Sequence, residues 1–398
     1  MKGIGLFVFG YPVLTFEGED FFGDECYRQT IGYCVPPLKE IIVVARRRKI
    51  EQRRQGCSRL ADASAKLGME LPDYGQGGMA GWLKAAKFIA SKRLMRSLVV
   101  LAARADFIYA DGPSFDAYLA AKAARRANKR IVIEMRGDVL LNHQYMTARF
   151  GLAGIGYSWL VRRTFDFVRR QAFAGLYINE YLMRRYPIQS SCNAAITDVH
   201  ISPEIYFKPK TFVSPATNYL YVGHLEKVKR VDLILRALAE AIGNLPDNWN
   251  LNIVGDGPEE YSLRRLAKRL GIEHRICFRG RIRWGDSLFT VYKQAHLLLV
   301  TSMTESGPRV IIEAMASGLP VLSTPVGLAP HVLDKRMIVN SWEVSAWARA
   351  IYSIANDPGI LTEMAQRNGD RSQDFDFKIL DARRRSFYAD AIKLAIQR

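Results

Sequence analysis

Two short apolar runs, 297–300 and 320–323, frame the segment that most constrains the fold of this chain. Each run is short enough for a strand that is buried on both faces. Between them, Gly307 can cap one helix, Pro308 suits its first position because proline lacks the N–H that would be unpaired there, and Gly318 can end it. A strand, a helix and a second strand in this order are typical of a parallel sheet, so we expect an α/β fold.

Two glutamates, Glu305 and Glu313, flank the start of the expected helix. In such a unit the free N–H groups of the helix start, around 308–310, point to the crevice beyond the strand ends, where anions are favoured. Glu305 then lies in the loop at the crevice, and Glu313 lies about two turns into the helix. A carboxylate is a poor phosphate ligand but accepts hydrogen bonds from sugar hydroxyls. The pair therefore suggests a sugar nucleotide, although two glutamates at this spacing are more often a solvated helix face.

Four sequence motifs in the C-terminal half carry a family resemblance. ESGPRVIIEAMASGLPVLSTPVG (305–327) is similar to the donor-site signature of the retaining glycosyltransferases of family 4. YVGHLEKVKRVDLILRAL (221–238) resembles the glycine-rich loop of that family, and LNIVGDGPEEYSLRRL (251–266) and ICFRGRI (276–282) resemble its next two strand-loop units. The resemblance implies a GT-B fold, in which two Rossmann-like doubly wound domains face each other across a cleft.

The resemblance also implies roles for single residues. Glu305 would contact the donor sugar, Glu313 the ribose hydroxyls and Lys229 the diphosphate. The other donor-binding residues that it implies are Gly223, His224, Gly255, Arg281, Gly307, Pro308, Arg309 and Val310. The chain departs from the family at His224, where an arginine is usual, so the phosphate charge would either be less well neutralised or be neutralised in part by Arg309. It departs again at 327–331, where many members carry a glutamate.

The activity implied is transfer of a hexose from an α-linked nucleotide diphosphate sugar, with retention and without a protein nucleophile. Lys229 and the helix N-terminus would stabilise the leaving diphosphate. Neither a metal nor a cofactor is expected, because protein cations neutralise the diphosphate. A saccharide, lipid-linked and used in bacterial surface polysaccharide assembly, is the expected acceptor. Two alternatives stay open: a nucleotide-sugar epimerase or other non-transferring GT-B enzyme, and a basic nucleic-acid-binding protein without enzymatic activity.

The N-terminal half also alternates expected strands and helices. Strands are predicted at 4–10, 40–45, 105–112 and 130–138, with a helix at 114–127. Arg136 and Asp138 end the last strand and are the catalytic candidates on the acceptor side, although an Arg-Asp pair at a strand end is often only a structural bridge.

Length and composition predict the domain organisation. A chain of 398 residues can form two domains, each with its own core. We expect an acceptor-binding domain over 1–200, a nucleotide-sugar-binding domain over 201–375 that begins with a proline-containing linker, and a C-terminal helical segment over 376–398 that crosses back to the first domain.

The formal net charge of +18 is concentrated in the N-terminal half, where residues 1–200 contain 30 Lys and Arg against 18 Asp and Glu. Segments 81–105 and 157–173 alternate basic and large apolar residues in a helical rhythm, which is typical of helices that lie in lipid headgroups. The same rhythm also fits ordinary helices packed on a core. An anionic membrane surface is the expected partner.

Nucleic acid is not an expected partner. The basic run ARRRKIEQRR (45–54) lacks any accompanying nucleic-acid-binding motif, and it is expected in the loop and helix after the strand at 40–45. The odd number of cysteines, five, favours a reducing compartment, and no signal peptide is evident. The expected location is cytoplasmic, peripheral on the inner membrane.

Overall fold

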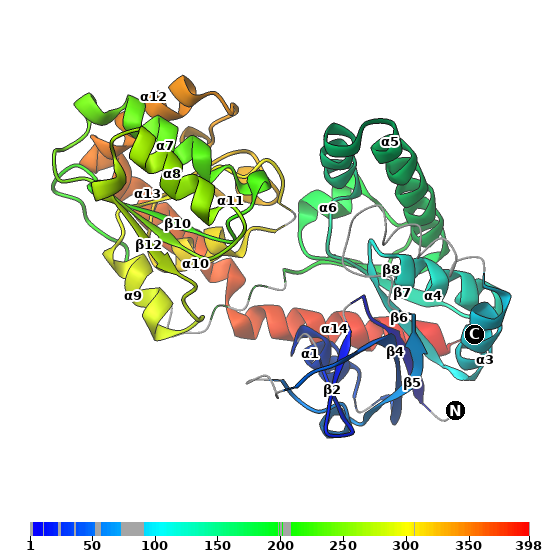
Figure 1. Ribbon diagram of the computed structural model, residues 1–398. Coiled ribbons are helices and arrows are strands. Elements are labelled where there is room, and N and C mark those ends of the chain that lie inside the picture. The colour runs from blue at the N-terminus through cyan, green and yellow to red at the C-terminus, as the bar shows by residue number, and fades with distance from the viewer. Residues whose placement is uncertain are drawn as a thin grey trace. The chain divides into compact units, whose positions relative to one another are not determined.

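The chain forms two compact units, each built on a mainly parallel sheet (Figure 1). This computed structural model describes residues 3–10, 12–22, 25–35, 37–51, 57–72, 91–197, 199, 201, 208–305 and 307–397. Unit 1 comprises Met1–Asp198 and Asp381–Arg398, and unit 2 comprises Val199–Leu380. The predicted α/β class with parallel sheets is confirmed.

Unit 1 contains one sheet and the helices that cover it. Its strands are β1 (Ile4–Val8), β2 (Val13–Phe16), β3 (Glu19–Phe21), β4 (Glu40–Lys49), β5 (Ala65–Leu71), β6 (Phe107–Gly112), β7 (Ile131–Met135), β8 (Ala172–Tyr177) and β9 (Asn193–Ala195). Its helices are α1 (Glu25–Cys34), η1 (Ala61–Ala63), α3 (Lys92–Arg104), α4 (Phe115–Arg126), α5 (Val139–Gln171) and α6 (Glu180–Arg185).

The strand order in unit 1 is β3-β2-β4-β1-β6-β7-β8-β9, with β5 paired to β4. The central strands β1, β6 and β7 are buried along their whole length, because helices cover both faces of a parallel sheet. Four predicted elements, the strands at 4–10, 105–112 and 130–138 and the helix at 114–127, match β1, β6, β7 and α4. Ser114 caps α4 by accepting a hydrogen bond from the Ala117 N–H.

The prediction that the basic run after the strand at 40–45 lies in a loop and a helix is wrong for its first part. The first part of it, Arg46 to Lys49, continues β4, whose outer end pairs with β2 in the register Val13↔Arg47. Positions 52–54 of that run lie outside the described residues, as do positions 81–90 of the basic segment 81–105.

Unit 2 contains a smaller sheet. Its strands are β10 (Asn218–Val222), β11 (Asn250–Val254), β12 (Ile276–Gly280), β13 (Leu297–Val300) and β14 (Val321–Ser323). Its α-helices are α7 (Val231–Glu240), α8 (Glu260–Arg269), α9 (Asp286–Gln294), α10 (Arg309–Ala316), α11 (Ala329–Val332), α12 (Val344–Ala355) and α13 (Pro358–Ser372). Its 3-10 helices are η3 (Lys227–Lys229), η4 (Ile242–Asn244), η5 (Glu273–Arg275), η6 (Lys335–Met337) and η7 (Gln373–Phe375).

The strand order in unit 2, β12-β11-β10-β13-β14, is parallel throughout and places β10 in the middle. One hydrophobic cluster packs α7, α8 and α12 on the sheet, and a second packs α9 and α10 on it. The described part of the predicted linker, 208–216, packs within this unit: the Phe212 N–H donates to Thr362 Oγ1 at 2.9 Å, and the Ala216 N–H to the Ala355 carbonyl at 2.7 Å.

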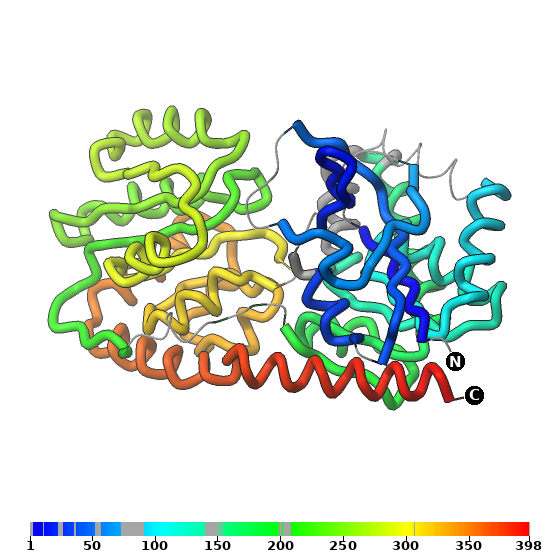
Figure 2. Tube along the Cα trace, turned by 90° about the horizontal axis from the view of Figure 1, so that it is seen from below, coloured from blue at the N-terminus to red at the C-terminus, as the bar shows by residue number. Residues whose placement is uncertain are grey.

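The last helix, α14 (Phe377–Ile396), begins in unit 2 and continues into unit 1, where the red end of the tube runs along the unit (Figure 2). A buried ion pair fixes it there. Arg384 Nη1 lies 3.4 Å from Glu134 Oε1, and both side chains are almost fully buried. Burial alone would raise the pKa of Glu134, but the guanidiniums of Arg136 and Arg384 outweigh burial and hold that pKa below its ordinary value.

Replacing Arg384 by methionine should lower the free energy of unfolding by about 3 kcal/mol, because it removes a partner from a buried carboxylate. The neighbouring Arg385 is the matched control. Arg385 pairs with Asp381 at 2.7 Å on the exposed side of the same helix, so Arg385→Met should cost about 1 kcal/mol or less. Urea unfolding followed by circular dichroism measures both, and equal losses would contradict the assignment of Arg384 as the anchor of α14.

Candidate donor-binding site

A pocket of about 220 Å³ lies at the carboxyl ends of β10 and β13 in unit 2. The two strands pair side by side, with Tyr219 opposite Leu297, so the loops that follow them meet at one edge of the sheet. The pocket is lined by Tyr221, Val222, Gly223, Lys229, Val300, Ser302, Glu305, Gly307, Pro308, Arg309 and Val310. The strand order reverses at this point of the sheet, which is where α/β folds bind their ligands.

Close backbone approach shapes the glycine-rich side of the pocket. Gly255 follows β11, and a Cβ atom placed on it would lie 1.9 Å from the Gly223 carbonyl oxygen. Its φ of +138° is also one that residues with side chains rarely adopt. The Gly223 N–H in turn donates to the Val254 carbonyl at 2.9 Å. Gly255 therefore acts by letting the loops after β10 and β11 touch, and it does not line the pocket itself.

Lys229 is the last residue of η3, and β13 holds this short helix in place. The hydroxyl of the buried Thr301 donates to the Lys229 carbonyl at 2.9 Å, and the Met303 N–H donates to the Val228 carbonyl at 2.8 Å. Arg230 then turns the chain into α7 with a left-handed backbone, φ +52° and ψ +40°. These contacts position the Lys229 ammonium over the pocket. Sequence reasoning missed Thr301, although its place directly after β13 was a signal.

The two predicted catalytic groups of unit 2, Lys229 and Glu305, form an ion pair. Lys229 Nζ donates to Glu305 Oε1, and the Ser302 hydroxyl donates to the same oxygen at 3.0 Å. About a fifth of each charged side chain is exposed. The pair is thus accessible from the pocket, and in this state the positive charge of Lys229 is already balanced.

The helix that follows Glu305 begins at Arg309, with Pro308 as the extended residue before it, so the predicted place of Pro308 within the first turn is off by one position. The exposed Arg309 and the half-buried Val310 open the first turn, and the N–H groups of these two residues have no acceptor within the helix. The helix ends at Gly318, as predicted: the Gly318 N–H donates to Met315 and the Leu319 N–H to Ala314, at 2.9 Å each.

Glu313 does not line this pocket. Its side chain lies on the buried face of α10 and is 5% exposed, and the Tyr292 hydroxyl donates to its Oε2 at 2.9 Å. Burial raises the pKa of Glu313, and hydrogen bonds from Tyr292 and Trp284 and the charge of Arg309 offset only part of that increase. Tyr292 and Trp284 were missed by sequence reasoning, because nothing in their local motifs sets them apart from core residues.

Two more predicted donor residues also lie outside the pocket. His224 is half exposed, with Nδ1 3.4 Å from Asp256 Oδ1 and Nε2 3.5 Å from Glu226 Oε1. Arg281 is exposed just after β12. The structure therefore gathers Gly223, Lys229, Glu305, Gly307, Pro308, Arg309 and Val310 around one cavity. It places His224, Gly255, Arg281 and Glu313 elsewhere in the same unit.

In unit 1, Arg136 follows β7 and is held from two sides. Its Nη2 lies 3.5 Å from Glu134 Oε1, and its guanidinium lies 5.3 Å from the centre of the Tyr27 ring. Tyr27 donates its hydroxyl to Asp111 at 2.8 Å, and burial raises the pKa of Asp111 although the charge of Arg136 lowers it. Sequence reasoning missed Asp111 and Glu134, which end neighbouring buried strands.

Asp138 is placed for a structural task. It is 2% exposed, and its carboxylate accepts hydrogen bonds from Tyr186 at 2.6 Å and Tyr181 at 2.8 Å, while Arg185 Nε lies 3.1 Å away. The expected Arg-Asp pair is thus divided: Arg136 pairs with Glu134, and Asp138 pairs with Arg185. Asp138 joins the end of β7 to α6.

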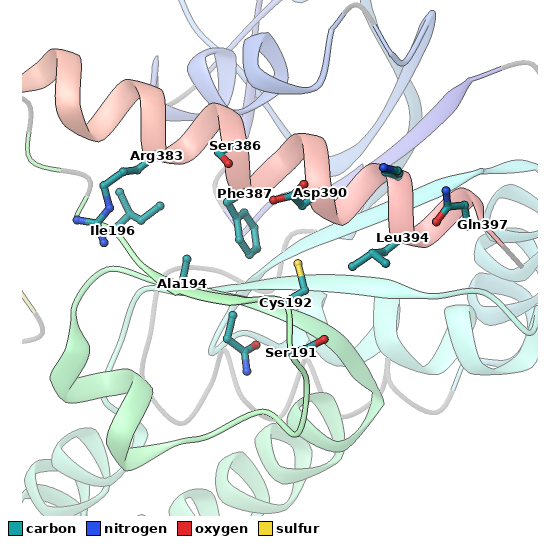
Figure 3. A pocket seen from close by; sticks show the side chains of 12 residues that line it. Ser191, Cys192, Ala194, Ile196, Arg383, Ser386, Phe387, Asp390, Leu394 and Gln397 are labelled. Carbon is teal, nitrogen blue, oxygen red and sulfur yellow. The ribbon is translucent and has the colours of Figure 1, made fainter.

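A second pocket, of about 540 Å³, lies in unit 1 between the segment around β9 and α14 (Figure 3). Its lining includes Cys192 and Phe387, which point toward each other across it, and the charged Arg383, Asp390 and Lys393. Burial, and then the charge of Asp390, raises the pKa of Cys192, so this thiol is a weak nucleophile near neutral pH. None of the predicted site residues lines this pocket.

Two features of the described residues concern metal ions and membranes. No three His, Cys, Asp or Glu side chains among them gather closely enough to hold a metal ion. Every helix in the described ranges is too short or too polar to cross a bilayer.

The sequence identifies the family of the second unit. Residues 204–373 match the glycosyl transferases group 1 family, which confirms the resemblance read from the motifs. A D-inositol 3-phosphate glycosyltransferase of Corynebacterium aurimucosum is 30% identical over 186 residues, 44% of this chain and 44% of that protein. An N-acetyl-alpha-D-glucosaminyl L-malate synthase of Bacillus anthracis is 35% identical over 115 residues, 29% of each. The matched region thus spans less than half of these relatives.

Solved structures resemble the chain over nearly its whole length. HepE of Anabaena, in complex with UDP and glucose, has a TM-score of 0.63 and 18% identity, covering 96% of this chain and 98% of that one. WaaG, a glycosyltransferase involved in lipopolysaccharide biosynthesis, has a TM-score of 0.61 and 15% identity, covering 99% and 100%. At such identities the likeness shows the fold, which is GT-B with two Rossmann-like units, as predicted.

Alanine at Gly255 should lower the free energy of unfolding by about 3 kcal/mol, because its Cβ would collide with the Gly223 carbonyl in a backbone conformation that is already unfavourable. Gly271 is the control: its φ is +69°, but a Cβ there meets nothing within 4 Å, so Gly271→Ala should cost only about 1 kcal/mol. Urea unfolding measures both. A loss at Gly255 no larger than that at Gly271 would show that the loops do not need this close approach.

Glutamine at Glu313 should leave the protein at least as stable as the native chain at pH 7.5. The raised pKa means that the folded state binds the proton more tightly, so native stability falls as the pH rises through the folded pKa of Glu313, and a neutral glutamine avoids that loss. The advantage should shrink as the pH approaches about 4. Thermal unfolding against pH measures it. Glu363→Gln is the control. The neighbouring Arg336 lowers the pKa of Glu363, so this substitution should lower the stability at pH 7.5 rather than raise it.

Proposed function

We propose that this protein is a retaining glycosyltransferase, which moves a hexose from an α-linked nucleoside diphosphate sugar to a saccharide acceptor. The observation that carries the proposal is the pocket in unit 2, where Lys229, Glu305 and the start of α10 meet. The family of residues 204–373 supports it, as do the relatives named as glycosyltransferases and the UDP and glucose bound to HepE.

Each part of the pocket suits one part of such a donor. The first turn of α10 and the exposed Arg309 favour the diphosphate, because free N–H groups and positive charge meet there. Glu305 can accept hydrogen bonds from sugar hydroxyls. When a donor binds, the Lys229 ammonium leaves Glu305 and contacts a phosphate oxygen. The Glu305 carboxylate then accepts hydrogen bonds from the sugar hydroxyls. The ion pair thus keeps both groups in position before the donor arrives.

The proposed chemistry uses these groups on the leaving side. The bond between the anomeric carbon and the diphosphate oxygen breaks, the acceptor oxygen bonds to that carbon on the same face, and the acceptor proton passes to the departing diphosphate. Lys229 and the N-terminus of α10 stabilise the charge that develops on the diphosphate. Neither a metal ion nor a further cofactor is required in this scheme. On the acceptor side, Arg136 is the candidate for contact with the acceptor. Asp138 is a positioning residue, which joins the end of β7 to α6.

We further propose that the acceptor is lipid-linked and serves bacterial surface polysaccharide synthesis, so that the enzyme works at the cytoplasmic face of the inner membrane. Support comes from the positive charge of residues 1–200 and from the structural likeness to WaaG, which is involved in lipopolysaccharide biosynthesis.

Glu305→Gln and Lys229→Ala should each reduce turnover of the donor by about 100-fold or more, because each removes a group that contacts the reacting ligand. The measurement is release of nucleoside diphosphate from a panel of UDP, GDP and ADP sugars, with the purified protein and an acceptor extract. Lys268→Ala, on the exposed side of α8, is the control and should keep native turnover.

Native turnover in both site variants would refute the assignment of the pocket. The anomeric configuration of the product, read by proton NMR, tests the stereochemistry separately. An α-linked product agrees with the proposal, and a β-linked product contradicts retention.

A further inference from the structure

Three large apolar side chains are exposed along one stretch of α5 in unit 1. Leu152 is 87% exposed, Ile155 47% and Trp159 58%. Their spacings of three, four and seven residues place them on one face of the helix. On the opposite face Phe165 and Val168 are buried in the core of the unit, so α5 is already packed without these three. We call Leu152, Ile155 and Trp159 the apolar stripe.

Arginine flanks the apolar stripe. The Arg163 guanidinium lies 5.1 Å from the centre of the Trp159 ring, one helical turn away, and Arg162 beside it is exposed. In this arrangement the charged group stands at the end of a stem that runs along apolar surface. The helix thus presents apolar groups bordered by positive charge, which is the pattern of helices that lie in the headgroup region of a bilayer.

The neighbouring helices extend the positive charge. Helix α4 packs between α3 and α5 in unit 1 (Figure 1). The exposed cations on α3 and α4 are Lys92, Arg93, Arg96, Arg104, Arg125 and Arg126. Helix α3 also exposes Val100, by 59%.

Negative charge is scarce on these helices. Helix α3 has no acidic residue, and Asp116 of α4 is buried. Asp166 of α5 lies 3.6 Å from Arg169 and is balanced by it. The surface around the apolar stripe is therefore strongly basic.

We propose that the apolar stripe of α5 inserts into the headgroup region of an anionic phospholipid bilayer, with the basic residues of α3, α4 and α5 contacting the lipid phosphates. This rests on the proposed function in one respect: a lipid-linked acceptor would then lie at the surface to which unit 1 binds. A nucleic acid would need only the cations and would leave Leu152 in water. A second copy of the chain would bring two basic faces together. A bilayer of anionic lipid satisfies both the apolar and the charged groups.

Flotation of the full chain with vesicles tests the proposal. We expect binding to vesicles of phosphatidylcholine mixed with phosphatidylglycerol, and about tenfold weaker binding to phosphatidylcholine alone. The variant Leu152→Ser/Ile155→Ser/Trp159→Ser, which changes only exposed side chains, should weaken binding to the mixed vesicles by about tenfold or more. Arg162→Glu/Arg163→Glu should do the same and should also remove most of the salt dependence.

Helix α8 of unit 2 supplies matched controls, because Tyr261 is 73% exposed and the Arg265 guanidinium lies 5.8 Å from the centre of its ring. This pair repeats the geometry of Trp159 and Arg163 without an apolar stripe beside it. Tyr261→Ser should leave vesicle binding unchanged. Arg265→Glu/Lys268→Glu makes the same change of net charge as Arg162→Glu/Arg163→Glu. It should change the logarithm of the vesicle partition coefficient by less than half as much.

Two outcomes with vesicles would overturn the proposal: no binding of the native chain to mixed vesicles, or equal losses of binding in the α5 and α8 variants. A third would be binding to DNA or RNA by both the native chain and the triple serine variant, with no binding of the native chain to vesicles. Nucleotide binding, followed by thermal stabilisation, should be unchanged in the α5 variants. Vesicle binding without turnover of any nucleotide sugar would refute the proposed function and leave the membrane surface standing.

Discussion

The central place of β10 in the sheet of unit 2 is the constraint on which the candidate donor site depends. Because β10 pairs with β11 on one side and β13 on the other, the loops after three strands meet at one edge. Gly255 lets two of these loops touch, and Thr301 ties η3 to the third. The loop after β10 supplies the Lys229 ammonium, and the loop after β13 supplies the Glu305 carboxylate and leads into α10, so these groups share one pocket of about 220 Å³.

The charges within that pocket are balanced before any ligand arrives. Lys229 and Glu305 satisfy each other, so neither stands as an unpaired charge in a partly buried place. The charge of Glu313, in contrast, is not balanced in this way. Burial raises the pKa of Glu313, so its negative form lowers the free energy of unfolding. A buried carboxylate that lowers stability is typical of functional positions.

The sequence predicted the strand-helix-strand unit closely, because β13, α10 and the turn at Gly318 are set by local signals: an apolar run, a proline and a glycine. It also predicted the gathering of Lys229, Glu305 and Arg309. It could not predict that Glu313 accepts a hydrogen bond from Tyr292 or that Asp138 accepts hydrogen bonds from Tyr181 and Tyr186, because no sequence motif links those residues. The continuation of β4 through Arg46 to Lys49 was missed because β2, its pairing partner there, lacked a clear pattern.

Calorimetric titration with a nucleoside diphosphate and with the matching nucleoside diphosphate sugar measures how the pocket divides the two parts of the ligand. We expect that the native protein binds the sugar form more tightly, that Glu305→Gln loses this difference but keeps its affinity for the diphosphate, and that Lys229→Ala weakens the binding of both ligands. If Glu305→Gln weakened the diphosphate and the sugar form equally, or if Lys229→Ala bound both like the native protein, the division of the pocket between sugar and phosphate would be wrong.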